Sequence, residues 1–202
     1  MTRIAPLDPP YDPAVEQRLL GMSPAGVAPI ALFRLMAKNL ALTEAAHALG
    51  SYLLGRRLSL SRREREIVID RTCARTGCEY EWGVHLAFFA DRVEFTAAQV
   101  TSLTHGQASD PCWPVARERL LIATVDALHD RCDLPDELWA QLSDAFDELE
   151  LLDLLLLTGW YRAVSYLARS TRLPLEPGRP TFASVAPPRP GPDQPDPEQV
   201  RV

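Results

Sequence analysis

Residues 61–89 read SRREREIVIDRTCARTGCEYEWGVHLAFF. Ser61 with Glu64 three positions later forms a capping box, which marks the start of a helix. Gly77 suits the position just after a helix C-terminus, and a second apolar helix resumes at Cys78. This stretch therefore predicts two helices that pack as an antiparallel hairpin across Gly77.

The predicted hairpin carries a thiol, two carboxylates and an imidazole. At about 100° per residue, Cys78, Glu81 and His85 fall within one stripe of the second helix. Glu66 on the first helix and His85 on the second both lie about two to three turns from Gly77. We therefore expect the two side chains to face each other in a sheltered pocket.

Such a pocket suits proton transfer. Burial raises the pKa of a carboxylate and lowers the pKa of a histidine, unless the two groups pair and hold each other charged. Either outcome places a proton donor or acceptor near neutral pH. We also expect the helix dipole to lower the pKa of the Cys78 thiol, because Cys78 stands near a helix N-terminus.

The rest of the chain predicts an all-α fold. Apolar spacings of three and four residues indicate six further helices, over 28–39, 43–54, 96–103, 114–130, 135–146 and 148–169, or about eight helices in all. Proline is frequent at both ends of the chain, where it opposes helix formation. We assign residues 1–14 to a proline-rich arm, 15–175 to the helical domain and 176–202 to a flexible tail.

Composition excludes several classes of protein. The 202 residues carry a net charge of −6, so the chain has no basic footprint for nucleic acid. No clean run of eighteen apolar residues and no signal-peptide core are present, which predicts a cytoplasmic protein without a membrane partner. The four cysteines show no CxxC spacing and do not form a secreted disulfide framework. The helix over 148–169 is so apolar that we expect it in the core or in a subunit interface.

Residues 63–90 resemble the carboxymuconolactone decarboxylase and alkylhydroperoxidase D-like superfamily, and residues 156–176 resemble its closing helix. The peroxidase branch has a Glu, then Cys-x-x-Cys twelve residues later, then a His four further on. Glu66, Cys78, Glu81 and His85 stand at those positions, and Tyr80 replaces the branch's histidine between the cysteines. Because Glu81 replaces the second cysteine, the chain resembles the decarboxylase branch, which implies an alkylhydroperoxidase D-like helical fold.

The resemblance implies a decarboxylase-like lyase or an isomerase that needs no cofactor and acts on a small carboxylated or lactone metabolite. By that analogy His85 is the general acid or base, Glu66 orients it or accepts a proton, and Glu81 supplies a second carboxylate. The resemblance also implies a homo-oligomer, as a dimer, trimer or hexamer. The expected substrate-binding residues are Tyr80 and Trp82, which shape the pocket, and Arg71 or Arg162, which would bind a carboxylate.

Other readings stay open. Cys78 could reduce peroxides together with an external thiol, or the chain could be a non-catalytic oligomeric binding protein. His85, Tyr80 and Trp82 are also typical core residues, Cys78 an inert buried thiol and Glu81 a solvated first-turn residue. A zinc site at Cys78, Glu81 and His85 is disfavoured, because three ligands on so short a piece of one helix are unusual. We therefore predict no metal.

Overall fold

The computed structural model describes residues 1–24 and 26–186, and this part of the chain is all-helical, as predicted. The described residues contain no strand. The helices are α1 Pro13–Met22, α2 Ala31–Met36, α3 Leu40–Leu53, α4 Arg62–Arg75, α5 Glu79–Phe89, α6 Ala97–His105, α7 Ala116–Arg131, α8 Asp136–Ala145 and α9 Glu148–Thr171, with short 3₁₀ helices η1 Asp91–Val93 and η2 Phe182–Val185.

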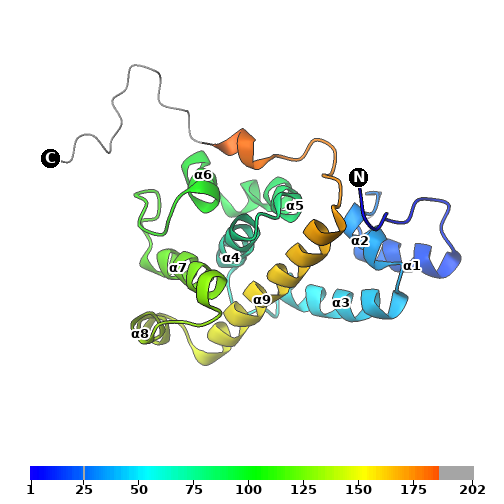
Figure 1. Ribbon diagram of the computed structural model, residues 1–202. Coiled ribbons are helices and arrows are strands. Elements are labelled where there is room, and N and C mark those ends of the chain that lie inside the picture. Colours follow the sequence, from blue (N-terminus) through cyan, green and yellow to red (C-terminus); the bar gives the residue numbers. More distant parts are fainter. Residues whose placement is uncertain (25, 187–202) are drawn as a thin grey trace, which may run out of the picture.

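Helix α4 lies at the centre of the fold, packed against α5, α6, α7 and α9 (Figure 1). Because neighbours surround it, residues 65–73 are all buried, and the apolar trio Ile67, Val68 and Ile69 is fully so. The charged residues of this segment are therefore held inside the protein. A helix with polar groups buried on this scale needs partners for them from the surrounding elements.

The hairpin forms where the sequence predicts it. Ser61 and Glu64 make the capping box that begins α4. Gly77 has φ +67°, a left-handed conformation that a glycine adopts without cost. The amide of Cys78 then donates to the carbonyl of Cys73 at 2.8 Å, so the chain turns directly into α5. This tight corner sets α5 against α4.

Helices α1, α2 and α3 form a separate group at one side of α9 (Figure 1). Helix α1 is absent from the helices that the sequence predicts, because prolines surround its start. Pro13 occupies the first turn, where its missing N–H costs nothing. Tyr52 at the end of α3 donates to Asp153 of α9 at 2.6 Å and ties the group to the rest of the fold.

Residues 176–186, the beginning of the segment assigned to the tail, lie against the helical body. Glu176 accepts a hydrogen bond from the Tyr80 hydroxyl at 2.7 Å, and the Phe182 ring packs on Trp82 with 5.0 Å between ring centres. The remainder of the expected flexible tail, residues 187–202, lies outside the described residues. Across the described part of the chain, no helix combines the length and apolar character that crossing a membrane requires.

Candidate active site

Glu66 and His85 meet in the protein interior. Oε2 of Glu66 lies 2.8 Å from Nδ1 of His85, and the two residues are 0% and 4% exposed. The other carboxylate oxygen of Glu66 accepts a hydrogen bond from Nε of Arg65 at 2.7 Å. Arg65 in turn donates to the Leu54 carbonyl at 2.8 Å. The Glu66 carboxylate is thus held in one orientation, and it fixes the histidine ring.

The second ring nitrogen of His85 faces two further groups. Nε2 lies 3.0 Å from the hydroxyl of Tyr161 on α9 and 3.5 Å from Oε1 of Glu81, one turn earlier on α5. Burial lowers the pKa of His85, but Glu66 and Glu81 outweigh this and raise it to about 10. The imidazole is therefore a cation at neutral pH, stabilised by a carboxylate on each side.

Glu81 carries a buried oxygen with no bonding partner. The residue is 5% exposed, and its Oε2 has no hydrogen-bond partner among the residues that the structure describes. A buried carboxylate oxygen without a donor is costly, so such an atom requires an explanation such as a functional role. Glu81 is also one of the residues that line a cavity.

This cavity has a volume of about 490 Å³ and lies between the α1–α3 group and helices α5 and α9. Its polar lining consists of Glu81, His85 and Tyr161 together with Arg92, His47, Ser23 and Ser51. The rest of the lining is mainly apolar and includes Met22, Ile30, Phe33, Met36, Val84, Phe88, Phe89, Trp160 and Val164. A small, mostly apolar molecule in this cavity would meet the adjoining side chains of Glu81, His85 and Tyr161.

Asp70 lies one turn after Glu66 on α4 and is 1% exposed. Its Oδ1 has no hydrogen-bond partner within the described residues. Burial, followed by the negative charge of Glu66, raises the pKa of Asp70 well above its ordinary value. Asp70 is not among the site residues predicted from the sequence, although its spacing of four from Glu66 places it on the same helix face. Arg65 and Tyr161 are not among them either.

Three aromatic or thiol residues predicted for the site lie beside it, outside the cavity lining. Tyr80 donates to Glu176, and Trp82 is fully buried against Phe182. Cys78 is also fully buried, and burial raises the pKa of its thiol. The expected lowering of this pKa is therefore wrong, because loss of water outweighs the effect of the helix N-terminus.

The two arginines proposed for substrate binding have other partners. Arg71 makes a bidentate ion pair with Asp126 at 2.7 and 2.8 Å and donates to the carbonyl of Leu103. Arg162 donates to Tyr166 and to the carbonyl of Leu128, on the side of α9 away from the cavity. Neither guanidinium lines the cavity that holds Glu81 and His85.

The all-helical arrangement around this central hairpin is an alkylhydroperoxidase D-like helical fold. Residues 41–125 match the model of the carboxymuconolactone decarboxylase family. The match includes the hairpin with Glu66, Glu81 and His85, so the resemblance inferred from the sequence is confirmed. A search of curated proteins found no match.

Solved structures share the fold. An uncharacterized peroxidase-related protein from Silicibacter sp. TM1040 has 18% identity and a TM-score of 0.72, and the alignment covers 86% of this chain and 93% of that one. A protein described as an alkylhydroperoxidase AhpD core, from Ralstonia eutropha JMP134, has 16% identity, a TM-score of 0.73 and coverages of 86% and 93%. The debrominase Bmp8 has 16% identity, a TM-score of 0.72 and coverages of 88% and 94%. These likenesses establish the architecture.

Proposed function

We propose that this protein is a cofactor-independent acid–base enzyme, a decarboxylase-like lyase or an isomerase, acting on a small lactone or other carbonyl compound. One observation carries the proposal: Glu81, whose buried Oε2 has no hydrogen-bond partner within the described residues, lines the cavity beside a histidine that Glu66 holds as a cation. A base and a proton source that adjoin in a mainly apolar cavity are the groups that proton transfer at carbon requires.

The hydrogen-bond directions suggest a role for each group. A doubly protonated His85 donates through Nδ1 to Glu66 and through Nε2 to the oxygen of Tyr161. The proton of Tyr161 is then available to a carbonyl oxygen of the substrate in the cavity. This hydroxyl would stabilise the negative charge that develops on that oxygen during the reaction.

Glu81 would carry the proton itself. In an isomerisation, its carboxylate takes a proton from a carbon next to the carbonyl and returns it to another carbon. In a decarboxylation, the C–C bond to the carboxylate breaks, CO₂ leaves, and the electron pair of that bond forms an enolate. The Glu81–His85 pair then delivers a proton to the carbon and regains one from water. Both reactions use the same three side chains, and neither needs an oxidant, a reductant or a cofactor.

The lining favours an uncharged or singly charged substrate. Among the described lining residues, Arg92 has the only arginine or lysine side chain. A lactone with one carboxylate would place its apolar ring against Phe33, Met36 and Trp160 and its charge toward Arg92. A substrate with several charges would lose its hydration without gaining partners.

The thiol peroxidase is the alternative that the peroxidase-related neighbours suggest. It depends on Cys78, which is fully buried, has a raised pKa and lies outside the cavity lining. A thiol nucleophile reacts as the thiolate, so this environment disfavours it. Peroxide consumption that disappears in Cys78→Ser would nevertheless establish the peroxidase. A non-catalytic binding protein would show neither activity.

The test is carbon-bound hydrogen exchange in D₂O, followed by NMR for a set of unsaturated lactones and keto acids. We expect exchange with the wild-type protein and with Cys78→Ser, and a loss of about 100-fold or more in Glu81→Gln and His85→Asn. Exchange at wild-type rates in both of these variants would exclude the proposed chemistry.

A further inference from the structure

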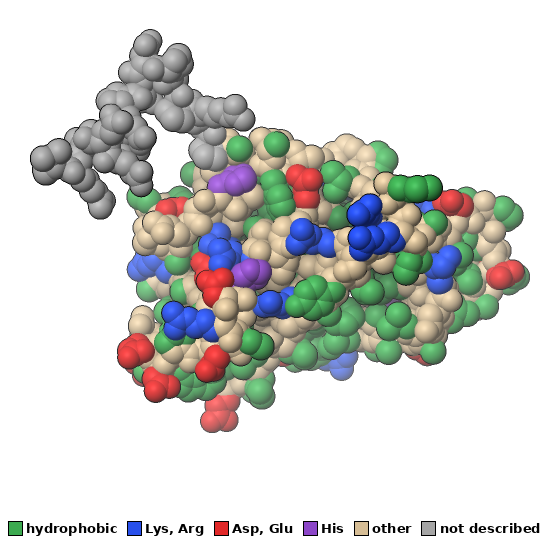
Figure 2. Space-filling view, in the orientation of Figure 1, with side chains coloured by type: hydrophobic (Ala, Val, Ile, Leu, Met, Phe, Trp, Pro, Cys, Tyr) green, Lys and Arg blue, Asp and Glu red, His purple; other side chains and the backbone are tan. Residues whose placement is uncertain are grey.

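A second hollow of about 520 Å³ lies on the opposite side of α9 from the active-site cavity, where α9 meets the ends of α4 and α7. We call it the arginine pocket, because Arg75, Arg162 and Arg169 line it together with His129, Tyr166 and Ser170. It shares no lining residue with the cavity of Glu81 and His85. Figure 2 shows this face, on which basic side chains gather over α9.

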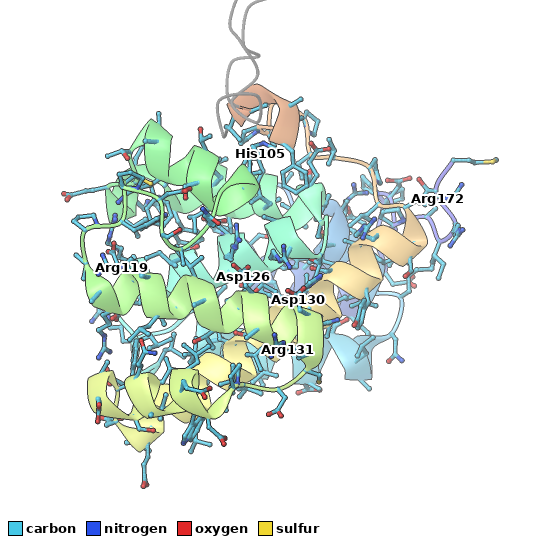
Figure 3. The ribbon with its side chains drawn as sticks, turned by 60° about the vertical axis from the view of Figure 1, so that its left-hand side comes forward. His105, Arg119, Asp126, Asp130, Arg131 and Arg172 are labelled. Carbon is cyan, nitrogen blue, oxygen red and sulfur yellow. The ribbon has the colours of Figure 1, made fainter. Side chains whose placement is uncertain are left out.

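The charges of the pocket do not cancel. Asp126 is held by Arg71 in a bidentate pair, and Asp130 accepts from Arg75 at 2.6 Å. Both aspartates lie on the side of α7 that faces α4 (Figure 3). Arg162 and Arg169 have no ion pair with any carboxylate among the described residues. Two guanidinium charges are thus left at the pocket, which matches the charge of a dianion.

Both of these guanidinium groups are held in place by neutral acceptors. Arg169 donates through Nη1 to the carbonyl of Thr76 and lies over Gly77, where an added Cβ would come within 3.3 Å of its Cζ. Arg162 donates to the hydroxyl of Tyr166 at 2.8 Å and to the carbonyl of Leu128 at 3.2 Å. In the described structure, Nη2 of Arg162 and both Nε and Nη2 of Arg169 have no acceptor, so they are available to a ligand.

A further observation indicates positive potential at the pocket. Nε of Arg75 is buried and forms an ion pair with Oδ1 of Asp126 at 3.3 Å, without a well-aligned hydrogen bond. Burial, followed by the charges of Arg75 and Arg162, lowers the pKa of His129, although Asp130 and Asp126 oppose this. The cationic groups therefore dominate the field at the pocket even with two aspartates nearby.

We propose that the arginine pocket binds a phosphate dianion, either inorganic phosphate or the phosphate of a small monoester. Guanidinium groups bind phosphate oxygens through paired, charge-assisted hydrogen bonds, and fixed arginines lose little entropy on binding. The hydroxyls of Tyr166 and Ser170 supply further donors at the same hollow. The volume exceeds that of inorganic phosphate, which leaves room for an organic group beside the Tyr166 ring.

The experiment follows the side-chain Nε–H resonances of the arginines by NMR during titration with phosphate, with chloride at matched ionic strength as reference. We expect the Arg162 and Arg169 signals to shift with phosphate and to saturate. Phenyl phosphate forms a second arm: tighter binding than inorganic phosphate would identify a monoester as the ligand, and equal binding would identify free phosphate. Either result supports the site.

The variants Arg162→Gln and Arg169→Gln should each weaken phosphate binding at least about tenfold, since each removes a charge-assisted contact. Arg131→Gln is the matched control. Arg131 is exposed in the last turn of α7 and does not line the pocket, so this variant removes the same charge at a different place. Circular dichroism checks that each variant is folded. Equal weakening in Arg131→Gln, or shifts with phosphate no larger than with chloride, would overturn the proposal and leave the arginines as helix C-terminal caps only.

Discussion

Nδ1 of His85 and Oε2 of Glu66 lie 2.8 Å apart, with neither side chain open to solvent. The two residues come from different helices, and the left-handed corner at Gly77 brings them together. An acid and an imidazole in this arrangement keep each other charged, because separating them would leave an unpaired charge in the protein interior. The stability of the fold and the proposed chemistry therefore depend on the same pair.

The pair predicts how stability varies with pH. The pKa of His85 in the folded protein is about 10, above the ordinary value of about 6.5 for an unfolded chain. Its contribution is therefore fully present below about pH 6.5 and is lost as the pH rises through about 10, and it is on the order of 5 kcal/mol. Urea unfolding from pH 6 upward should show this loss in the wild type and a much flatter profile in His85→Gln. Parallel profiles for the two proteins would contradict the assignment.

The buried carboxyl group of Asp70 predicts a second dependence of stability on pH, which the variant Asp70→Asn tests. Its raised pKa means that the folded protein holds a proton that the unfolded chain has released, so stability falls as the pH rises above about 4. Asp70→Asn keeps the shape of the protonated acid and cannot ionise. The variant should gain stability relative to the wild type as the pH increases from 4 to 7. A stability difference that stays constant over this range would show that Asp70 ionises freely in the folded protein.

The left-handed backbone at Gly77 predicts that a side chain at this position lowers the stability of the fold. Its φ of +67° is unfavourable for any residue with a Cβ, and the new atom would lie 3.3 Å from the Arg169 guanidinium. Gly77→Ala should lower the free energy of unfolding by about 1–2 kcal/mol. Gly159→Ala is the control: this helical glycine has no atom within 4 Å of an added Cβ, so alanine there should stabilise by up to about 1 kcal/mol. Equal effects at the two sites would show that the corner does not constrain the chain.

The exposed leucines of α9 predict how two copies of the chain would associate. Leu149, Leu152 and Leu156 are 66%, 64% and 47% exposed and lie in a row at spacings of three and four, which suits helix pairing. We propose that this row meets the same row of a second copy. Leu152→Glu should then lower the mass measured by light scattering, whereas Leu20→Glu on α1, with 68% exposure, should leave it unchanged. A monomeric wild type would exclude this interface.

The sequence predicted what local signals determine. The capping box at Ser61, the turn at Gly77 and the helical spacing were sufficient to place Glu66 opposite His85. The partners of that pair were not local. Tyr161 lies 76 positions from His85, and the contact of Glu176 with Tyr80 spans 96 positions. Only tertiary packing determines which distant side chain reaches a buried group.

Burial explains the remaining differences between the predictions from the sequence and the structure. Arg71 and Arg162 are of a residue type that binds carboxylates. Helical periodicity alone does not indicate that Arg71 already pairs with Asp126, or that Arg162 already donates to a helix carbonyl. Likewise, the helix N-terminus correctly suggests a lower pKa for Cys78 in water. Full enclosure of the thiol reverses the direction. The position of Asp70 on the face of Glu66 could have been predicted from the spacing of the two residues. Its lack of a hydrogen-bond partner could not.

The central claim is that His85 is held as a cation between Glu66 and Glu81, and its ring ¹⁵N chemical shifts test this most directly. We predict that both nitrogens of His85 are protonated at pH 8 in the wild type, that they titrate near pH 10, and that Glu66→Gln moves this titration downward. A neutral imidazole at pH 8 in the wild-type protein would contradict the account.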